Sequence, residues 1–198
     1  MNLPTIVLTG GIACGKSLFA EYLREEGVLT LDADDVTHEL EAPGGSAVPL
    51  IRENFGAGVI DESGAVNRKA LAKIIFADEE ARNKLNSILH PLVRKRLKDW
   101  VQTPGDAVKV VVIPLLFECG WEDDWDVVIC LAASEQTQMD RLVRTRGYSE
   151  WDAKLRIASQ MQVSEKAARS QIVIQNDGNE EALHCEARRV AEILRTLR

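Results

Sequence analysis

The sequence predicts an α/β protein with a five-stranded parallel sheet packed between two layers of helices. Two observations support this prediction. Short apolar runs alternate with amphipathic stretches along most of the chain, and the first apolar run leads through a glycine-rich turn into a helix. With 198 residues, of which 45% are hydrophobic, the chain can bury a substantial core without a second independent domain.

The glycine-rich turn spans residues 9–17, which read T-G-G-I-A-C-G-K-S and contain the pattern G-x-x-x-x-G-K-S. Gly10 and Gly15 can adopt backbone angles that other residues disfavour, so that successive N–H groups turn inward and surround a polyphosphate at the helix N-terminus. Lys16 is expected to reach the β- and γ-phosphates, and Ser17 is expected to bind Mg²⁺. We therefore predict a nucleotide-binding P-loop of the P-loop NTPase type.

The second predicted strand covers residues 28–31 and follows Gly27, which ends the first helix. Asp32, Asp34 and Asp35 lie directly after this strand. Ligands bind beyond the carboxyl ends of parallel strands, so an acid here faces the same crevice as the P-loop. We expect Asp32 to accept a proton from an attacking hydroxyl or to organise Mg²⁺. The alternative is that one of these three acids only caps the helix that follows, a role that also suits Asp34 or Asp35.

Residues 36–102 leave the alternation of strands and helices and form a helical insertion broken by glycine-rich turns. One amphipathic helix is predicted at residues 67–76, and Asp78 is expected to cap another that ends near Pro91. The basic run at residues 94–98 is expected on a solvated helix face, with contact to an anionic substrate as the alternative.

The sheet resumes at residues 108–113, and two further strands are predicted at residues 126–131 and 171–175. An Asn-Asp-Gly turn then leads into a final amphipathic helix. The predicted organisation has a nucleotide-binding core of residues 1–35, 104–146 and 166–198, a helical substrate-binding subdomain of residues 36–103, and a helical lid of residues 147–165.

Between the last two strands, Ser134 is expected to cap a helix that ends in a group of arginines. Ser149 and Asp152 resemble a capping box and begin a second helix that is expected to run to Met161, and a short segment of small and charged residues up to Ser170 then leads to the last strand. In an acidic protein these arginines can close over a transferring phosphoryl group and neutralise its charge; each alone is otherwise a solvated helix-end charge. The arginines are Arg141, Arg144 and Arg146.

The composition excludes several classes of partner. The 24 Lys and Arg residues against 31 Asp and Glu give a net charge of −7, which disfavours a broad surface for nucleic acid or anionic membranes. The four cysteines form no C-x-x-C pair, which argues against structural zinc or a disulfide framework and fits a reducing cytoplasm. The longest strongly apolar run, at residues 110–117, is too short to span a membrane.

The order of the motifs favours a small-molecule kinase. A GTPase switch would carry D-x-x-G after its third strand and N-K-x-D later, and neither is present. A kinase of the nucleoside-monophosphate-kinase type is instead indicated by three features: an acid after the second strand, a helical insertion and an arginine-rich lid. Two alternatives stay open: a kinase of the same architecture that acts on a nucleotide or nucleoside, and a nucleotide-binding regulator with slow or no turnover.

At the level of motifs, the chain resembles the dephospho-CoA kinase family over essentially its whole length. The motifs are T-G-G-I-x-x-G-K-S at residues 9–17, D-A-D at 32–34, L-H-P at 89–91, P-L-L-F-E at 114–118 and N-x-G at 176–178. The combination of D-A-D, L-H-P and P-L-L-F-E is much more specific than the P-loop alone.

This resemblance implies ATP-dependent phosphorylation of the ribose 3′-hydroxyl of dephospho-CoA, the last step of coenzyme A synthesis. It implies ATP and Mg²⁺ as cofactors, dephospho-CoA as substrate, no nucleic-acid or membrane partner, a cytoplasmic location, and a monomer or weak oligomer. The catalytic residues are expected to be Asp32, Lys16, Arg141, Arg144 and Arg146. The residues expected to bind ATP are Gly11, Ile12, Ala13, Cys14, Gly15, Lys16, Ser17, Leu18, Asn176 and Gly178. Those expected near the acceptor are Asp34, Arg68, His90, Leu115, Leu116 and Glu118, and those expected near the metal are Ser17 and Asp32.

Two of these assignments depend on more than one interpretation. From its position before a proline, His90 is more typical of a structural histidine than of a catalytic one. The second lid arginine of the family falls on Thr145 when counted from Arg141, and on Arg146 when counted from Gln160 with one residue inserted. Arg144 and Arg146 are therefore both candidates.

Overall fold

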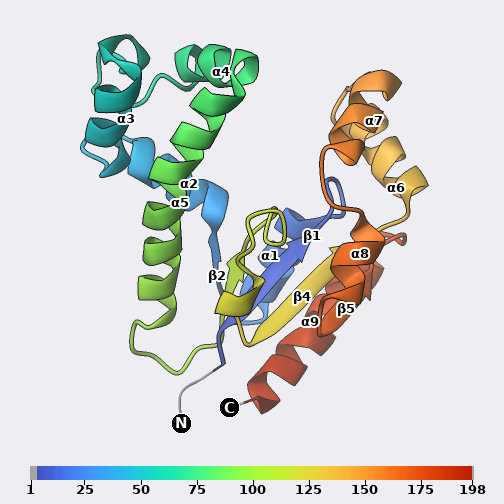
Figure 1. Cartoon of the computed structure of the whole chain (residues 1–198). Coiled ribbons are helices and arrows are strands. Elements are labelled where there is room, and N and C mark those ends of the chain that lie inside the picture. The colour runs from blue at the N-terminus through green and yellow to red at the C-terminus, as the bar shows by residue number, and fades with distance from the viewer. Residues whose placement is uncertain (1–3, 198) are drawn as a thin grey trace. The chain divides into compact units, whose positions relative to one another are not determined.

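The computed structural model describes residues 4–197, and its internal contacts divide the chain into two compact units. One unit combines the described residues up to Leu31 with those from Pro104 onward, and the other is Asp32–Thr103. Figure 1 shows the elements of both units. Each unit is described separately below.

The first unit is built on a sheet with the strand order β2-β3-β1-β4-β5. β1 runs parallel to β3 and β4, and β4 runs parallel to β5. The predicted five-stranded parallel α/β sheet is confirmed. The strands are β1 (Ile6–Gly10), β2 (Leu29–Asp32), β3 (Lys109–Val112), β4 (Val127–Ala132) and β5 (Ile172–Gln175).

Helices follow the strands of this unit, and side-chain alternation separates the two faces of the sheet. Ile6 and Leu8 of β1 lie in one apolar cluster with α1 and α9 side chains such as Phe19 and Leu183. Because successive strand residues point to opposite faces, Thr9 points to the other face, where α8 lies (Figure 1). The helices are α1 (Lys16–Glu25), α6 (Glu135–Asp140), α7 (Glu150–Ala158), α8 (Val163–Ala168) and α9 (Glu180–Thr196).

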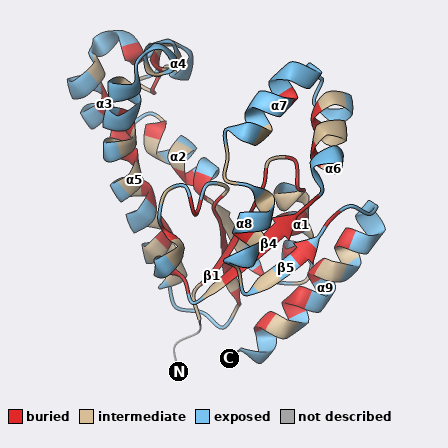
Figure 2. Ribbon diagram, turned by 45° about the vertical axis from the view of Figure 1, so that its right-hand side comes forward, coloured by how far each residue is buried: buried red, intermediate tan, exposed pale blue. Residues whose placement is uncertain are grey.

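The central strands β1, β3 and β4 are deeply buried, whereas β2 and β5 are partly exposed, and Figure 2 shows β1 and β4 buried along nearly their whole length. All five residues of β1 are buried, and so are the last five residues of β4. The sequences of β1 and β4 are therefore almost continuously apolar, as expected for central strands that are covered by helices on both faces.

The second unit is helical and has its own apolar core. Leu71, Leu85 and Leu89 pack there with Ile51 and smaller residues. Its elements are α2 (Ala33–Glu41), α3 (Ala47–Phe55), the short 3₁₀ helix η1 (Ala57–Val59), α4 (Arg68–Ala77) and α5 (Glu79–Val101).

The end of α5 was expected near Pro91, and this expectation is wrong: the helix continues to Val101. Leu89, Val93 and Leu97 are buried and recur every four residues, so they form one apolar face on both sides of the proline. Pro91 itself is exposed. Burial of this face stabilises the helix although the proline removes one backbone hydrogen bond.

Several predicted helix ends are confirmed. The Ser134 side chain accepts a hydrogen bond from Thr137 N at 3.2 Å and starts α6. Ser149 Oγ accepts one from Asp152 N at 3.1 Å and starts α7. The helix predicted to run to Met161 instead ends at Ala158, and the short segment that follows it contains α8.

Candidate functional site

The P-loop lies between β1 and α1, and its backbone has the curvature that the sequence predicts. Gly10 has φ 147° and Gly15 has φ 94°. A Cβ atom on Gly10 would lie 2.1 Å from the carbonyl oxygen of Leu131 in β4, so only glycine allows this close approach of the two strands. Ala13 has φ 57°, a left-handed conformation that costs an alanine roughly 1–2 kcal/mol.

Lys16 begins α1 with its ammonium group turned toward the loop. Its Nζ donates hydrogen bonds to the carbonyl oxygens of Gly10 at 3.0 Å and Gly11 at 2.8 Å. Burial, and secondarily the positive charge of Lys166, lower the pKa of Lys16 to about 8. The side chain is therefore still mainly a cation at neutral pH. Ser17 is exposed in the first turn of the same helix.

Side chains from three distant segments hold the loop at consecutive residues. Gln160 Oε1 accepts a hydrogen bond from Ile12 N at 3.0 Å. Arg141 donates to the Ala13 carbonyl at 3.2 Å, and the buried Asn176 donates through Nδ2 to the Cys14 carbonyl at 2.9 Å. Asn176 was expected near a nucleotide base; in this structure its amide braces the P-loop.

A cavity of about 360 Å³ opens beside this braced loop. P-loop residues, the arginine-bearing turn after α6 and the residues that follow β5 all contribute to its wall. Predicted nucleotide-binding and catalytic residues thus meet at one place although they are far apart in the sequence. The lining residues are Ala13, Gly15, Leu18, Arg141, Thr145, Arg146, Asn176, Gly178, Asn179, Glu180 and Leu183.

One π-helical turn explains which arginines line the cavity. Arg141–Thr145 wind as a π-helix, and Arg146 N donates to the Arg141 carbonyl at 3.3 Å. The i→i+5 bonding of such a turn accommodates one residue more than an α-helical turn and brings residues five apart together. Counting from Arg141 placed the second lid arginine of the family at Thr145, and counting from Gln160 with one residue inserted placed it at Arg146. The π turn accommodates one extra residue, which accounts for this difference.

Arg144 lies elsewhere. Its side chain is 80% exposed, and its guanidinium is 4.0 Å from the Asp140 carboxylate. It lines a separate hollow together with residues of α6 and α7, among them Met139 and Lys154. The structure thus brings Arg141 and Arg146 to the P-loop and does not bring Arg144 there.

The carboxylate expected to act as base, Asp32, is the last residue of β2 and the N-cap of α2. Its Oδ1 accepts a hydrogen bond from Asp34 N at 2.8 Å. The alternative interpretation, that one of the three acids caps this helix, applies to Asp32 and not to Asp34 or Asp35, which are exposed in its first turn. The cap uses one carboxylate oxygen of Asp32, and Asp32 remains the predicted base.

In the second unit, Arg68 is held by a partner that the sequence did not indicate. Its Nε donates to the Glu41 carboxylate at 2.7 Å, and the Glu41 side chain is only 7% exposed. A buried carboxylate needs such a partner, so this ion pair fixes Arg68 at the start of α4. His90 is half-buried in α5, and burial lowers the pKa of its imidazole, which favours the neutral form.

The segment after β3 contributes to the core of the first unit more than the sequence suggested. Leu116 is fully buried, whereas Leu115 is 42% exposed. The Glu118 carboxylate accepts hydrogen bonds from Met161 N at 3.0 Å and forms an ion pair with Lys166 at 2.8 Å. Of the three residues expected near the acceptor in this segment, only Leu115 has a freely exposed side chain.

Two residues with clear structural roles, Lys166 and Glu41, were not identified from the sequence. Both are charged side chains that the fold buries, and a charged residue inside an amphipathic stretch is indistinguishable from a surface residue until its neighbours are known. Cys14, inside the P-loop, is also buried, and burial raises the pKa of its thiol. It is therefore kept protonated and unreactive.

The chain matches known proteins over most of its length. The family model for dephospho-CoA kinase matches residues 4–182. A dephospho-CoA kinase from Geobacter sulfurreducens is 42% identical over 197 residues, which cover 98% of this chain and 97% of that protein. One from Shouchella clausii is 40% identical over 179 residues, with 89% and 91% covered.

Solved structures show the same fold. The protein TT1252 from Thermus thermophilus superposes with a TM-score of 0.81 at 30% identity and covers 99% of both chains. Dephospho-CoA kinase from Campylobacter jejuni superposes with a TM-score of 0.70 at 23% identity, with 98% of both chains covered. A shikimate kinase from Acinetobacter baumannii, at 0.53 and 15%, shares the fold more distantly.

Proposed function

Because this chain belongs to the dephospho-CoA kinase family, we propose that it transfers the γ-phosphoryl group of ATP to the ribose 3′-hydroxyl of dephospho-CoA. Phosphorylation of dephospho-CoA by ATP is the final step of coenzyme A biosynthesis. One observation carries the assignment of the site: the cavity beside the P-loop is lined by Arg141 and Arg146 together with P-loop residues.

ATP binding uses the backbone of the P-loop. The loop's N–H groups and the N-terminus of α1 provide partial positive charge for the phosphates. The cavity lined by Leu18, Asn176 and Gly178 is of the size that holds small ligands, and we place the adenosine there. Asn176 and Gly178 both line this cavity, and the Asn176 amide also holds the P-loop at Cys14.

Three cations stabilise the charge that develops during transfer. Lys16 and the two arginines of the π turn, Arg141 and Arg146, supply positive charge around the transferring phosphoryl group. Fixed charges of this kind act without reorganisation at the moment of reaction and form the largest contribution in phosphoryl transfer.

The acceptor hydroxyl needs a base, because the pKa of an alcohol lies far above 7. Asp32 supplies a carboxylate at the end of β2, and this carboxylate is the proton acceptor in this proposal. The helical unit Asp32–Thr103 binds dephospho-CoA, with Arg68 fixed by Glu41 for contact with an anionic group of that substrate.

Mg²⁺ is the metal that this proposal assigns to the reaction. The Ser17 hydroxyl and the Asp32 carboxylate are oxygen ligands, which this cation prefers, and ATP phosphates and water supply the rest of an octahedral shell. When bound, the metal neutralises phosphate charge. Ser17 is exposed at the start of α1 and accessible to such a ligand.

We further propose a cytoplasmic monomer or weak oligomer that binds no nucleic acid. The net charge of −7 supports the last point. Among the residues that the structure describes, no helix has the length and apolar character needed to cross a membrane.

Phosphorus NMR of the product tests the function. With ATP and dephospho-CoA we expect a new phosphomonoester signal beside an intact pyrophosphate, and with AMP as acceptor almost no turnover. Lys16→Ala is the control and should reduce the rate by about 10²–10³-fold, because one electrostatic contact to the transferring group is lost. Formation of a phosphoanhydride from AMP would instead identify a nucleotide kinase.

A further inference from the structure

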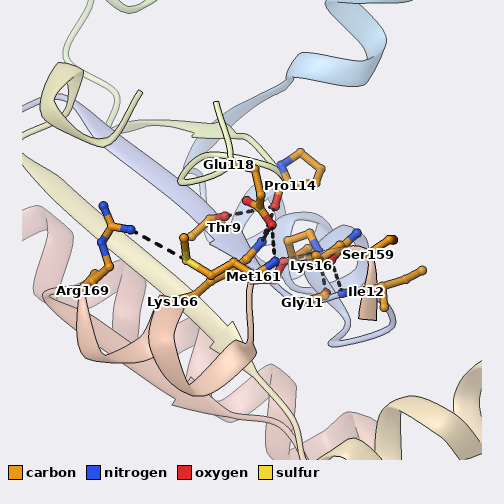
Figure 3. Close-up of polar contacts among 12 residues, drawn as sticks. Thr9, Gly11, Ile12, Lys16, Pro114, Glu118, Ser159, Met161, Lys166 and Arg169 are labelled. Carbon is orange, nitrogen blue, oxygen red and sulfur yellow. Dashed lines mark hydrogen bonds and ion pairs between the residues drawn. The ribbon is translucent and has the colours of Figure 1, made fainter. Parts of the chain in front are cut away.

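Lys166 in α8 is a charged residue in an unusual place. Its side chain has no exposed surface, and its ammonium group donates to the Pro114 carbonyl at 3.0 Å and pairs with Glu118 at 2.8 Å. Figure 3 shows the side chain pointing toward both partners, beside Lys16 and the first residues of the P-loop. Each of the two acceptors follows β3 at the carboxyl edge of the sheet.

Stability alone does not explain this lysine. Removing the ammonium group of Lys166 from water costs several kcal/mol, which its attraction to the partly exposed Glu118 carboxylate offsets only in part, and apolar residues often replace buried charges without loss. We therefore ask which geometry the buried ammonium group fixes. The geometry it fixes here is that of the connector between α7 and α8.

The connector, residues 159–162, joins the ion pair to the P-loop. Met161 N donates to the same Glu118 oxygen that binds Lys166, at 3.0 Å. The preceding residue, Gln160, accepts the hydrogen bond from Ile12 N at 3.0 Å. On the other side, Thr9 Oγ donates to the Pro114 carbonyl at 3.4 Å, so Lys166 is connected to both ends of the segment that leads into the loop.

We propose that Lys166 is a positioning residue for phosphoryl transfer: through Glu118 and Met161 it fixes Gln160, and Gln160 fixes the Ile12 amide of the P-loop. This proposal rests on the proposed kinase function. The loop's N–H groups have to point at the phosphates in the transition state, and a displacement of about 1 Å at such a site costs on the order of 10²-fold in rate. Lys166 itself touches neither substrate.

The test replaces Lys166 by Met, which has a similar length and no charge. We expect Lys166→Met to lower kcat about 10- to 100-fold with the KM for dephospho-CoA nearly unchanged, because substrate contacts stay in place. Lys166→Arg, which keeps the charge and the donors, should recover part of the loss. Arg189→Met, which removes an exposed positive charge from α9 in the first unit, is the matched control and should behave like the unmodified protein.

A second variant, Gln160→Ala, and NMR of the ligand-free protein test whether Lys166 acts through Gln160. Gln160→Ala should lower kcat similarly, and the double variant should be no worse than either single one, since the two residues act in series. In the ligand-free protein, both variants should shift the Ile12 amide NMR signal and speed its hydrogen exchange.

Unchanged kcat in Lys166→Met, or additive losses in the double variant, would overturn the proposal. The amide measurement needs no substrate, so it tests the connection to Ile12 even if dephospho-CoA is not the acceptor. If Lys166→Met does not fold, the Gln160→Ala variant carries the test: an unchanged kcat and an unchanged Ile12 amide signal there would overturn it.

Discussion

Asp32 combines two tasks in one side chain. It caps α2 through Oδ1, and we propose that it accepts the proton of the attacking hydroxyl. Asparagine is as good a helix cap as aspartate but cannot act as a base. The two tasks can therefore be separated by a single substitution.

We expect Asp32→Asn to lose turnover by about 10²–10⁴-fold, the contribution typical of general base catalysis, while its thermal unfolding midpoint stays close to that of the unmodified protein. Steady-state ADP release and calorimetry measure the two effects. Asp35→Asn, at an exposed position in the same helix turn, is the control. A large loss of stability with normal turnover would show that Asp32 acts only as a cap.

At the scale of elements, the π turn at Arg141–Thr145 decides which arginine faces the cavity. Because residues five apart come together in such a turn, Arg146 joins Arg141 while Arg144 faces solvent. We expect Arg146→Ala to reduce kcat by about 10²-fold or more, and Arg144→Ala to change it by less than about threefold. Each variant is the control of the other in the same kinetic assay, and the reverse order of effects would contradict the geometry.

Prediction from sequence succeeded for features that depend on neighbouring residues and failed for those that depend on tertiary packing. The P-loop, its flanking strand and helix, and the caps at Ser134 and Ser149 depend on neighbouring residues, and these were predicted correctly. The continuation of α5 through Pro91 depends on a core that only the folded unit provides. Local propensity is overridden by such packing.

In the candidate site, too, the features that depend on local sequence were predicted and those that depend on the folded structure were not. The sequence placed arginines near the P-loop but could not choose between Arg144 and Arg146, since the choice depends on a π-helical winding that no local pattern indicates. It could not indicate the ion pair of the buried Lys166 with Glu118 either, because the partners are separated by 48 residues (166 − 118) and meet only in the folded unit.

At the scale of the whole molecule, the chain forms two compact units, and the proposal assigns one substrate to each. Hydrogen exchange with each ligand alone tests this division. A non-hydrolysable ATP analogue should slow exchange in the P-loop, in residues 141–146 and in the predicted lid at 147–165. Dephospho-CoA should slow exchange within Asp32–Thr103. Protection of the first unit alone by both ligands would contradict the assignment of the helical unit to substrate binding.

The three hydrogen bonds that hold the P-loop have a consequence for how the protein folds. They join residues 148, 128 and 162 positions apart, from Ile12 to Gln160, from Ala13 to Arg141 and from Cys14 to Asn176. Contacts between residues so distant in sequence form late, because a long segment must be closed before they can be made. On the ribosome, the P-loop is among the first segments to emerge, yet it can acquire its binding conformation only after β5 has been synthesised and has paired with β4. A nascent chain that ends before Asn176 should therefore not bind nucleotide.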